Sequence, residues 1–422
     1  MRDIWITGVG HTVFARHPER SLADLAMEAA VEAAEDAGVG LDEIDAVFFS
    51  NSTWGYFDNQ HCIRAQVAFQ GTPLAGKPMV NVENACAGAS TALHLARTSV
   101  AAGQYGVVLA VGAEKIFNAD TGKMFGAFLT ALDVARAEEH LGRLMGLRGK
   151  AVTELNARRP ELAARMPRDE GGQRTVFMDV YAAFALWHMA RFGSTPEQLA
   201  AIAAKNHNHA VANPKAQIRI PMTPEEVLAD RLVSWPLTRS MCSPIGDGAA
   251  AAIVVSDEIK KRRDGSRAVR IRASALRTGT ARDVDDVESD IAVRTVRAAY
   301  NEAGVTPEEI DVAEIHDATA FGELHQSEAL GFCPMGEGGV FALEGHSTIG
   351  GRLPINTSGG LECRGHPIGA SGLAQIHELV LQLRGEAGER QVEGVRLALA
   401  ENGGGNIGYE EATLVIHILE GP

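Results

Sequence analysis

Residues 80–96, VNVENACAGASTALHLA, join two patterns of different period. The first letters are typical of a short strand, and the last nine are typical of a helix with small residues on every side. Cys86 therefore lies at a strand-to-helix elbow. The unpaired N–H groups and positive dipole end of the helix favour a thiolate, so we expect a nucleophile near neutral pH. For this residue taken alone, a buried, inert cysteine is the alternative.

Composition limits the class of protein. The chain has 422 residues, of which 45% are hydrophobic and 22% charged, as in ordinary globular proteins. No apolar run reaches the roughly 18 residues that span a bilayer, so we expect a soluble, cytoplasmic protein. The five cysteines show no CxxC spacing, which argues against disulfides and a metal site. A net charge of −15 disfavours nucleic acid or an anionic membrane as a partner.

The chain contains an internal repeat. Ala37 corresponds to Ala303 and Asp45 to Asp311, an offset of 266 residues in both cases. In each copy an Ala-rich helical pattern precedes an Ala-Gly-Val turn, and an apolar strand follows an Ile-Asp step. Ser21 is a plausible N-cap for the first of these helices.

This alternation predicts an α/β protein with two similar halves, whose continuous apolar strands form sheets covered on both faces. We expect the first half to comprise residues 1–117 and 236–257, and the second half residues 266–422. Residues 118–235 lack the strand pattern and are predicted to form an inserted loop domain.

The second half carries further candidates for chemistry. His316 directly follows a predicted strand, where open α/β sheets place ligands. His366 lies in a glycine-rich loop, beside Pro367, which restrains the backbone. Residues 401–405, ENGGG, also follow a strand and would expose N–H groups able to stabilise an oxyanion. With Cys86, these elements supply what acyl transfer requires.

In their order and spacing, these motifs resemble the thiolase superfamily over nearly the whole chain. The matching stretches are the cysteine elbow, the Gly-His-Pro motif, the terminal glycines and the DGAA run at 247–250. The His-Asp pair at 316–317 is similar to the sterol-carrier-protein type and its bacterial and archaeal acetyl-CoA acetyltransferase relatives. The resemblance implies the thiolase fold, with two βαβαβαββ halves in five layers, α-β-α-β-α.

The resemblance also implies roles for individual residues. Cys86 would attack a thioester carbonyl and hold the acyl group, while His366 accepts its proton. His316 and His366 would form one oxyanion hole, and the N–H groups of Cys86 and Gly403 the other. Further substrate contacts are expected from Gly404, Ser358 and Gly359. Coenzyme A would be a substrate, bound through the inserted region, and no covalently bound cofactor is implied.

One departure from the family pattern concerns the second catalytic cysteine. Thiolases carry it just before the terminal glycines or just after His-Asp, where this chain has Glu401 and Ala318. A second acid/base must still move a proton at the α-carbon. Glu401 is the best-placed candidate and Cys363 the second, although Cys363 is equally consistent with a loop cysteine of no consequence.

The sequence therefore predicts a degradative thiolase that cleaves a 3-oxoacyl-CoA with CoA through an acyl-Cys86 intermediate. Trp54, Tyr56 and Phe57 suggest a larger acyl group, whether branched, aromatic or dicarboxylic, but equally fit a core or dimer interface. The alternatives are a thiolase-fold retro-aldolase acting on a 3-hydroxyacyl-CoA, and a non-catalytic acyl-CoA-binding subunit. The resemblance also leads us to expect a homodimer and, as a further partner, a small protein combining a zinc ribbon and an OB-fold.

Overall fold

The computed structural model describes residues 3–167, 172, 174–280 and 282–422. A few positions of each predicted domain, namely 1–2, 168–171, 173 and 281, lie outside these ranges. The described strands form one nine-stranded sheet, in the order β3-β2-β4-β7-β1-β8-β11-β10-β9, and a separate two-stranded ribbon. No described helix has the length and apolarity needed to cross a membrane.

The repeat is visible in the order of the elements. The first half consists of β1 (Ile4–His11), α1 (Leu22–Ala37), β2 (Ala46–Ser50), α2 (Trp54–Asp58), α3 (Arg64–Ala68), β3 (Met79–Val82), α4 (Gly88–Ala101), β4 (Val107–Glu114) and β7 (Gly248–Ser256). The second half consists of β8 (Val269–Thr278), α12 (Ile291–Ala303), β9 (Val312–Glu314), α13 (Ala320–Ala329), α14 (Gly338–Leu343), α15 (Gly360–Cys363), α16 (Ser371–Arg384), β10 (Leu397–Gly404) and β11 (Thr413–Glu420). Between the halves, α11 (Asp257–Lys261) joins β7 to β8.

Both halves use the same strand order. The first runs β3-β2-β4-β7-β1, and the second runs from a parallel bridge at Ile355 through β9-β10-β11-β8. The two sheets meet where Trp5 pairs with Arg270 and Ile6 with Val269, so β1 and β8 join them edge to edge.

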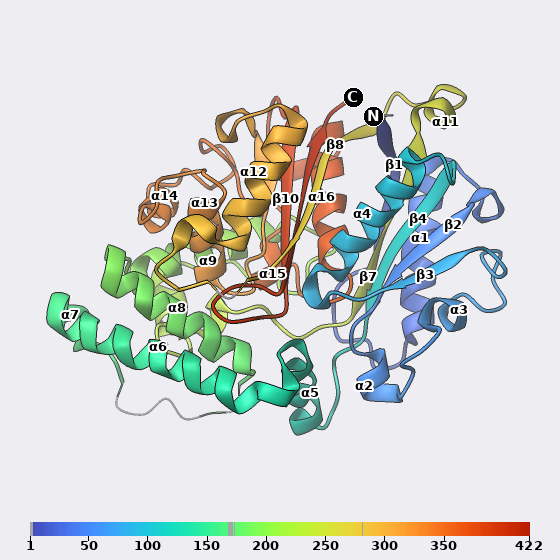
Figure 1. Ribbon diagram of the computed structural model, residues 1–422. Coiled ribbons are helices and arrows are strands. Elements are labelled where there is room, and N and C mark those ends of the chain that lie inside the picture. Colours follow the sequence, from blue (N-terminus) through green and yellow to red (C-terminus); the bar gives the residue numbers. More distant parts are fainter. Residues whose placement is uncertain (1–2, 168–171, 173, 281) are drawn as a thin grey trace.

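The layers follow from which side chains pack together. One apolar cluster combines α4 and α16 with strand residues of both halves, which places these two helices between the sheets. A second cluster packs α1 on the outer face of the first sheet, and a third packs α12 on the outer face of the second. Figure 1 shows α4 and α16 at the centre of the molecule. The predicted five-layer thiolase fold is confirmed.

The helices α1 and α12 end in the same way, and α1 also begins with a capping box. The Ser21 hydroxyl accepts a hydrogen bond from the Asp24 N–H at 3.0 Å, and the Asp24 carboxylate accepts one from the Ser21 N–H at 2.9 Å. This capping box confirms the predicted start of α1. Both α1 and α12 end at a left-handed glycine, Gly38 and Gly304, which needs no Cβ there.

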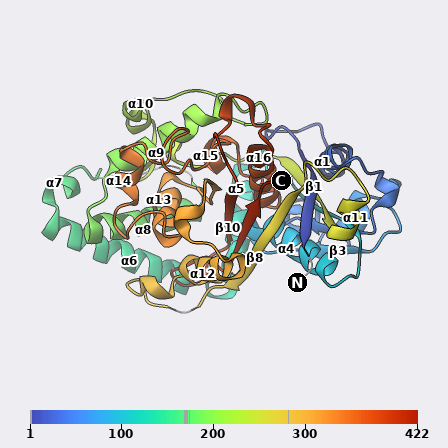
Figure 2. The ribbon, with the colours of Figure 1, turned by 90° about the horizontal axis from the view of Figure 1, so that it is seen from above.

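The segment after β4 is helical. It contains α5 (Thr121–Phe128), α6 (Ala137–Arg158), α7 (Pro160–Ala163), α8 (Val176–Phe192), α9 (Pro196–Ala210) and α10 (Pro224–Ala229), followed by the ribbon of β5 (Leu232–Ser234) and β6 (Leu237–Thr238). Although the segment leaves from the first half, α8 and α9 pack against α13 of the second. Figures 1 and 2 show α6 and α8 along the side of the second half. The insertion therefore covers the region where both halves place their candidate residues.

The strand before the terminal glycines is longer than predicted. The sequence indicated a strand ending at Ala400 and then a loop, but Glu401 pairs with Ile416 and Gly404 with Thr413 within β10 and β11. A Cβ at Gly404 would lie 2.4 Å from the Asn84 carbonyl oxygen. Glycine is needed because the strand touches the backbone of the cysteine elbow.

Two glycine-to-alanine substitutions should have opposite effects on stability. A Cβ at Gly112 in β4 would lie 2.1 Å from the Gly369 carbonyl oxygen, so Gly112→Ala should destabilise the protein by about 2 kcal/mol. Gly142 lies exposed in α6 with nothing within 4 Å, so Gly142→Ala should stabilise it by about 0.5–1 kcal/mol. Denaturant unfolding measures both, and equal effects would contradict the packing at Gly112.

Candidate active site

The backbone is strained where Cys86 is presented. Ala85 has φ +47, a left-handed conformation that is costly for a residue with a Cβ. Its N–H donates to the Glu83 carboxylate at 2.7 Å, which holds the turn. Cys86 lies in the short 3-10 turn Ala85–Ala87 directly before α4, as the elbow predicted.

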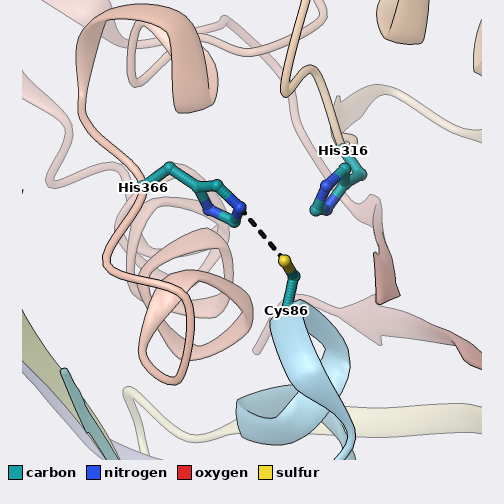
Figure 3. Close-up of side chains that lie close together, drawn as sticks. All are labelled: Cys86, His316 and His366. Atoms are coloured by element: carbon teal, nitrogen blue, oxygen red, sulfur yellow. Dashed lines mark hydrogen bonds between the residues drawn. The ribbon is translucent and has the colours of Figure 1, made fainter. Parts of the chain in front are cut away.

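The Cys86 thiol faces an imidazole from the other half. Its Sγ lies 3.3 Å from Nε2 of His366 (Figure 3). The Ser371 hydroxyl donates to the Pro367 carbonyl at 3.0 Å and lies 2.6 Å from Nδ1 of His366. Because the hydroxyl proton is used, Nδ1 carries the imidazole proton and Nε2 is left as the acceptor for the thiol.

A second imidazole, that of His316, lies beside this pair and presents a donor where His366 presents an acceptor. The Asn402 side-chain amide donates to Nδ1 of His316 at 3.0 Å, so Nε2 of His316 carries the proton. The rings of His316 and His366 are 5.2 Å apart and nearly perpendicular. The site thus pairs one imidazole that accepts a proton with another that donates a hydrogen bond.

The Sγ of Cys86 and a ring nitrogen of each histidine all lie within 4.8 Å of one another. Such a set could hold a cation, but a metal needs a thiolate and a free imidazole lone pair. Here the His366 lone pair accepts a hydrogen bond from the Cys86 thiol. The arrangement is that of a nucleophile and base.

Cys86 is a thiol at rest, which corrects the prediction from the sequence that it is a thiolate. Burial raises the pKa of the thiol to about 12, and the carboxylates of Glu114 and Glu83 add to this effect. Hydrogen bonding from the N–H groups of Cys86 and Gly405 opposes the rise without cancelling it. Desolvation outweighs the helix dipole because protein surrounds most of the partly buried thiol.

Both imidazoles are also uncharged. Burial, with His316 and Arg364 nearby, holds the pKa of His366 well below its ordinary value. Burial, and then Arg364, lowers the pKa of His316 to about 4. At neutral pH the resting site therefore consists of a thiol and two neutral imidazoles.

A cavity of about 600 Å³ opens onto this group. Cys86, His316, His366, Gly403 and Gly404 line its reactive end. The inserted segment and its flanks supply an apolar wall of Phe128, Leu132, Phe177, Met178 and Tyr181. The titratable carboxyl groups among the described lining residues are those of Glu83, Asp133 and Glu411, and no lysine or arginine is among them.

Buried ion pairs fix the His366 loop behind the cavity. Nη1 of Arg364 lies 3.0 Å from the Glu314 carboxylate at the end of β9, and the Ser358 hydroxyl donates to the same carboxylate at 2.6 Å. The Leu361 N–H donates to Asp317 at 2.6 Å. These contacts tie the loop to the strand that carries His316.

Several predicted residues therefore lie outside the cavity lining. Ser358 is buried against Glu314, and Gly359 has φ +95 with its α-carbon packed against Ala210. Cys363 is fully buried in a small apolar cluster under α9. The glycine-rich loop shapes the site from behind because its polar groups are used to bind the loop to β9.

Glu401 also lies behind the reacting groups. It is fully buried, and one carboxylate oxygen accepts the backbone N–H of His316 at 2.8 Å. Burial raises the pKa of this carboxyl to about 8. Glu401 thus holds the strand end that carries His316 and does not line the described cavity.

Glu114 joins the elbow region to the His366 loop. Its buried carboxylate accepts hydrogen bonds from the Thr53 hydroxyl at 2.6 Å and the Gly369 N–H at 3.0 Å. The bond from Gly369 crosses between the halves of the repeat. Glu114 therefore helps set the position of His366 relative to Cys86.

Sequence reasoning missed some residues of the site. Asn402 and Ser371, which fix the imidazole tautomers, lie inside the motifs that were recognised but were not singled out. Glu411, in the loop after the glycines, gave no motif signal. Trp54, Tyr56 and Phe57 do not line the cavity, and Phe128, Phe177 and Tyr181 from the insertion take that place.

Comparison with known proteins agrees with this geometry. Residues 5–231 match the family "Thiolase, N-terminal domain", and residues 273–417 match "Thiolase C-terminal domain-like". The chain belongs to the thiolase family. It is an acyltransferase of this family, as its relatives named below indicate.

This thiolase is 35% identical to the acetyl-CoA acetyltransferase of Methanothermobacter thermautotrophicus, with 99% of each chain covered. It is 34% identical to human sterol carrier protein 2, over 95% of this chain and 70% of the relative. It is 32% identical to the benzoylsuccinyl-CoA thiolase subunit BbsB of Thauera aromatica, over 96% and 95%. The predicted branch is confirmed.

Solved structures share the fold. A structure named Ltp2-ChsH2(DUF35) aldolase has a TM-score of 0.73 at 24% identity, with 99% of this thiolase and 98% of that chain covered. Human mitochondrial 3-ketoacyl-CoA thiolase in complex with CoA has a TM-score of 0.64 at 15% identity, with 100% and 98% covered.

The neutral resting pair predicts how Cys86 reacts with iodoacetamide. Because its pKa is raised to about 12, the thiolate fraction should keep growing with pH, and the alkylation rate should rise without a plateau from about pH 6 to about pH 10. Mass spectrometry of the Cys86 peptide follows the rate, with Cys86→Ser as the blank for the other cysteines. A plateau near neutral pH would indicate a thiolate-imidazolium pair instead.

Proposed function

We propose that this thiolase cleaves a 3-oxoacyl-CoA with free CoA, through an acyl group held on Cys86. The observation that carries the proposal is the Cys86 thiol directed at the Nε2 lone pair of His366 at the end of a cavity. Cys86 attacks the 3-oxo carbonyl as His366 takes its proton. Because both groups are neutral at rest, proton transfer accompanies the attack.

Two sets of donors stabilise the oxyanions that form during the reaction. Nε2–H of His316, held as a donor by Asn402, binds one thioester oxygen. The N–H groups at the elbow and at the terminal glycines bind the oxygen on the acylated carbon. Gly405, whose N–H already lies against the Cys86 sulfur, joins Gly403 in that second set.

The acyl group is large and apolar. A cavity of about 600 Å³ lies within the range that encloses a substantial ligand. A smaller cavity of about 60 Å³ beside it shares Phe177 and Tyr181 and adds Phe184, Trp187 and Phe321. These rings favour an aromatic or branched group. The carboxylates of Glu83 and Asp133 at the cavity disfavour a dicarboxylic acyl group.

Coenzyme A is the second substrate. The neutral pantetheine arm suits the apolar wall of the inserted segment, while the phosphates of coenzyme A remain outside the acidic cavity.

We also propose a homodimer and, as a further partner, a small protein combining a zinc ribbon and an OB-fold. The name of one structural neighbour couples a thiolase-fold chain with a second protein, and that of one relative calls it a subunit.

Intact mass after brief exposure to acyl-CoA and 3-oxoacyl-CoA thioesters tests the function. The wild type should gain the mass of the acyl group, and Cys86→Ala should gain none, because the thioester forms on that sulfur. Cys62→Ala, which removes an exposed cysteine outside the cavity, is the matched control and should still be acylated. Cleavage by Cys86→Ala without an adduct would instead favour the retro-aldolase.

The hydrogen bond from Asn402 to His316 gives a second test. Asn402→Asp replaces the donor by an acceptor, so the His316 proton moves to Nδ1 and its Nε2–H is lost from the cavity. We expect kcat to fall by about 10²–10³, the usual effect of removing an oxyanion donor. Asn402→Ala, which leaves the tautomer free, should fall less. Steady-state kinetics with unchanged kcat in both variants would contradict this role.

A further inference from the structure

Carbon-carbon cleavage leaves a carbanion at the α-carbon, and this carbanion needs a proton donor. His366 already holds the proton of Cys86, so a second acid/base must act on the same cavity. The family positions for a second cysteine hold Ala318, which has no titratable group, and Glu401, which lies behind His316. Another group on the cavity lining must therefore supply this proton.

Three carboxyl groups line the described cavity. Glu83 and Asp133 are exposed; Glu83 accepts the Ala85 N–H, and Asp133 pairs with Arg136 on the surface. The Tyr181 phenol also lines the cavity and is partly buried. Burial and neighbouring acidic groups raise its pKa well above the ordinary value. Only Glu411 among these carboxyl groups is both partly buried and placed at the reactive end.

Glu411 is positioned by the glycines of β10. A Cβ at Gly403 would lie 2.8 Å from the Cγ of Glu411 and 3.4 Å from its Oε1. A Cβ at the next residue, Gly404, would lie 3.0 Å from the backbone nitrogen of Cys86. The glycine end of β10 thus packs against Glu411 at Gly403 and against the cysteine elbow at Gly404, and Glu411 and Cys86 line the same cavity.

A side chain from α13 orients this carboxyl. The Gln326 amide donates to Oε1 of Glu411 at 3.2 Å, and Gln326 is itself buried. Burial and the nearby charge of Asp290 raise the pKa of Glu411, while His325 and Arg282 oppose that rise. Tyr181 on α8 and Glu401 on β10 also interact with its charge. The raised pKa favours the protonated Glu411 carboxyl, which is the form that can give a proton.

We propose that Glu411 is the catalytic acid/base that replaces the second cysteine of thiolases, an inference that rests on the proposed cleavage of 3-oxoacyl-CoA. When the Cys86 sulfur has added to the 3-oxo carbon, the bond between C2 and C3 breaks and its electron pair remains on C2. The Glu411 carboxyl gives its proton to C2, which forms the shorter acyl-CoA and leaves Glu411 as a carboxylate.

The second half-reaction restores both groups. The thiol of incoming CoA gives its proton to the Glu411 carboxylate, and its sulfur attacks the acyl carbon on Cys86. The bond from that carbon to the Cys86 sulfur breaks, and His366 returns its proton to the sulfur. The proton gained by C2 is thus balanced by the one lost from CoA.

Two half-reactions separate this role from that of Cys86. Acylation of Cys86 by a simple acyl-CoA reverses the second half-reaction, so Glu411 only has to protonate the departing CoA sulfur, which is a good leaving group. Exchange of the C2 hydrogens of an acyl-CoA with D₂O instead requires a base that takes a proton from carbon. In Glu411→Gln we therefore expect the adduct to form more slowly but completely, and C2 exchange to fall at least about 100-fold, by a larger factor than adduct formation. The wild-type exchange rate should rise with pH as Glu411 ionises, and this dependence should vanish in the variant. Mass spectrometry measures the adduct, and NMR measures the exchange.

Glu401→Gln is the matched control, because it makes the same change at the carboxyl that lies outside the cavity lining and keeps an acceptor for the His316 N–H. It should retain more C2 exchange than Glu411→Gln. Exchange that survives in Glu411→Gln, or is lost only in Glu401→Gln, would overturn the proposal. A wild type that forms no adduct but exchanges C2 hydrogens through Glu411 would support the proton role and reject thiolytic cleavage.

Discussion

The hydrogen bond between Cys86 and His366 is the contact on which the site depends, because each residue comes from a different half of the repeat. Sγ and Nε2 are 3.3 Å apart, although 280 positions separate the residues along the chain. Their separation is set by the central layer, since Cys86 precedes α4 and His366 precedes α16. The close approach of Gly112 to Gly369 and the hydrogen bond that the Gly369 N–H donates to Glu114 fix these helix starts relative to each other. The packing of the core therefore also sets the distance between the two catalytic residues.

Burial decides the protonation of the site. A water-exposed helix start would favour a thiolate, but here the surrounding protein and two carboxylates raise the pKa of Cys86 to about 12. The same desolvation keeps His366 and His316 neutral. The site therefore carries no charge on these three residues at rest. Charge forms only when Cys86 attacks a substrate carbonyl. Preorganised donors aimed into the cavity then matter more than a lowered thiol pKa.

Much of the fold could be predicted from the sequence because the repeat and the elbow are local patterns. The offset between Asp45 and Asp311 located corresponding turns, and the capping box at Ser21 located a helix start. Cys86, His316 and His366 were recognised because motifs carry them. The shared cavity and the tautomers could not be predicted, because they depend on contacts such as Asn402 to His316 that only the assembled halves create. Glu411 gave no signal for the same reason, since its place depends on the bare glycines opposite it.

The acidic residues around the site divide into those that support the backbone and those that face the cavity. Glu114, Glu314 and Glu401 each accept backbone N–H groups from the segments that carry His316 or His366, and all three are fully buried. Such carboxyls compensate for loops whose N–H groups would otherwise be buried without partners. Glu411 differs because it reaches the cavity past residues that have no side chains. A carboxyl with raised pKa can then replace a thiol in proton transfer, since what the α-carbon requires is a nearby group that both loses and regains a proton.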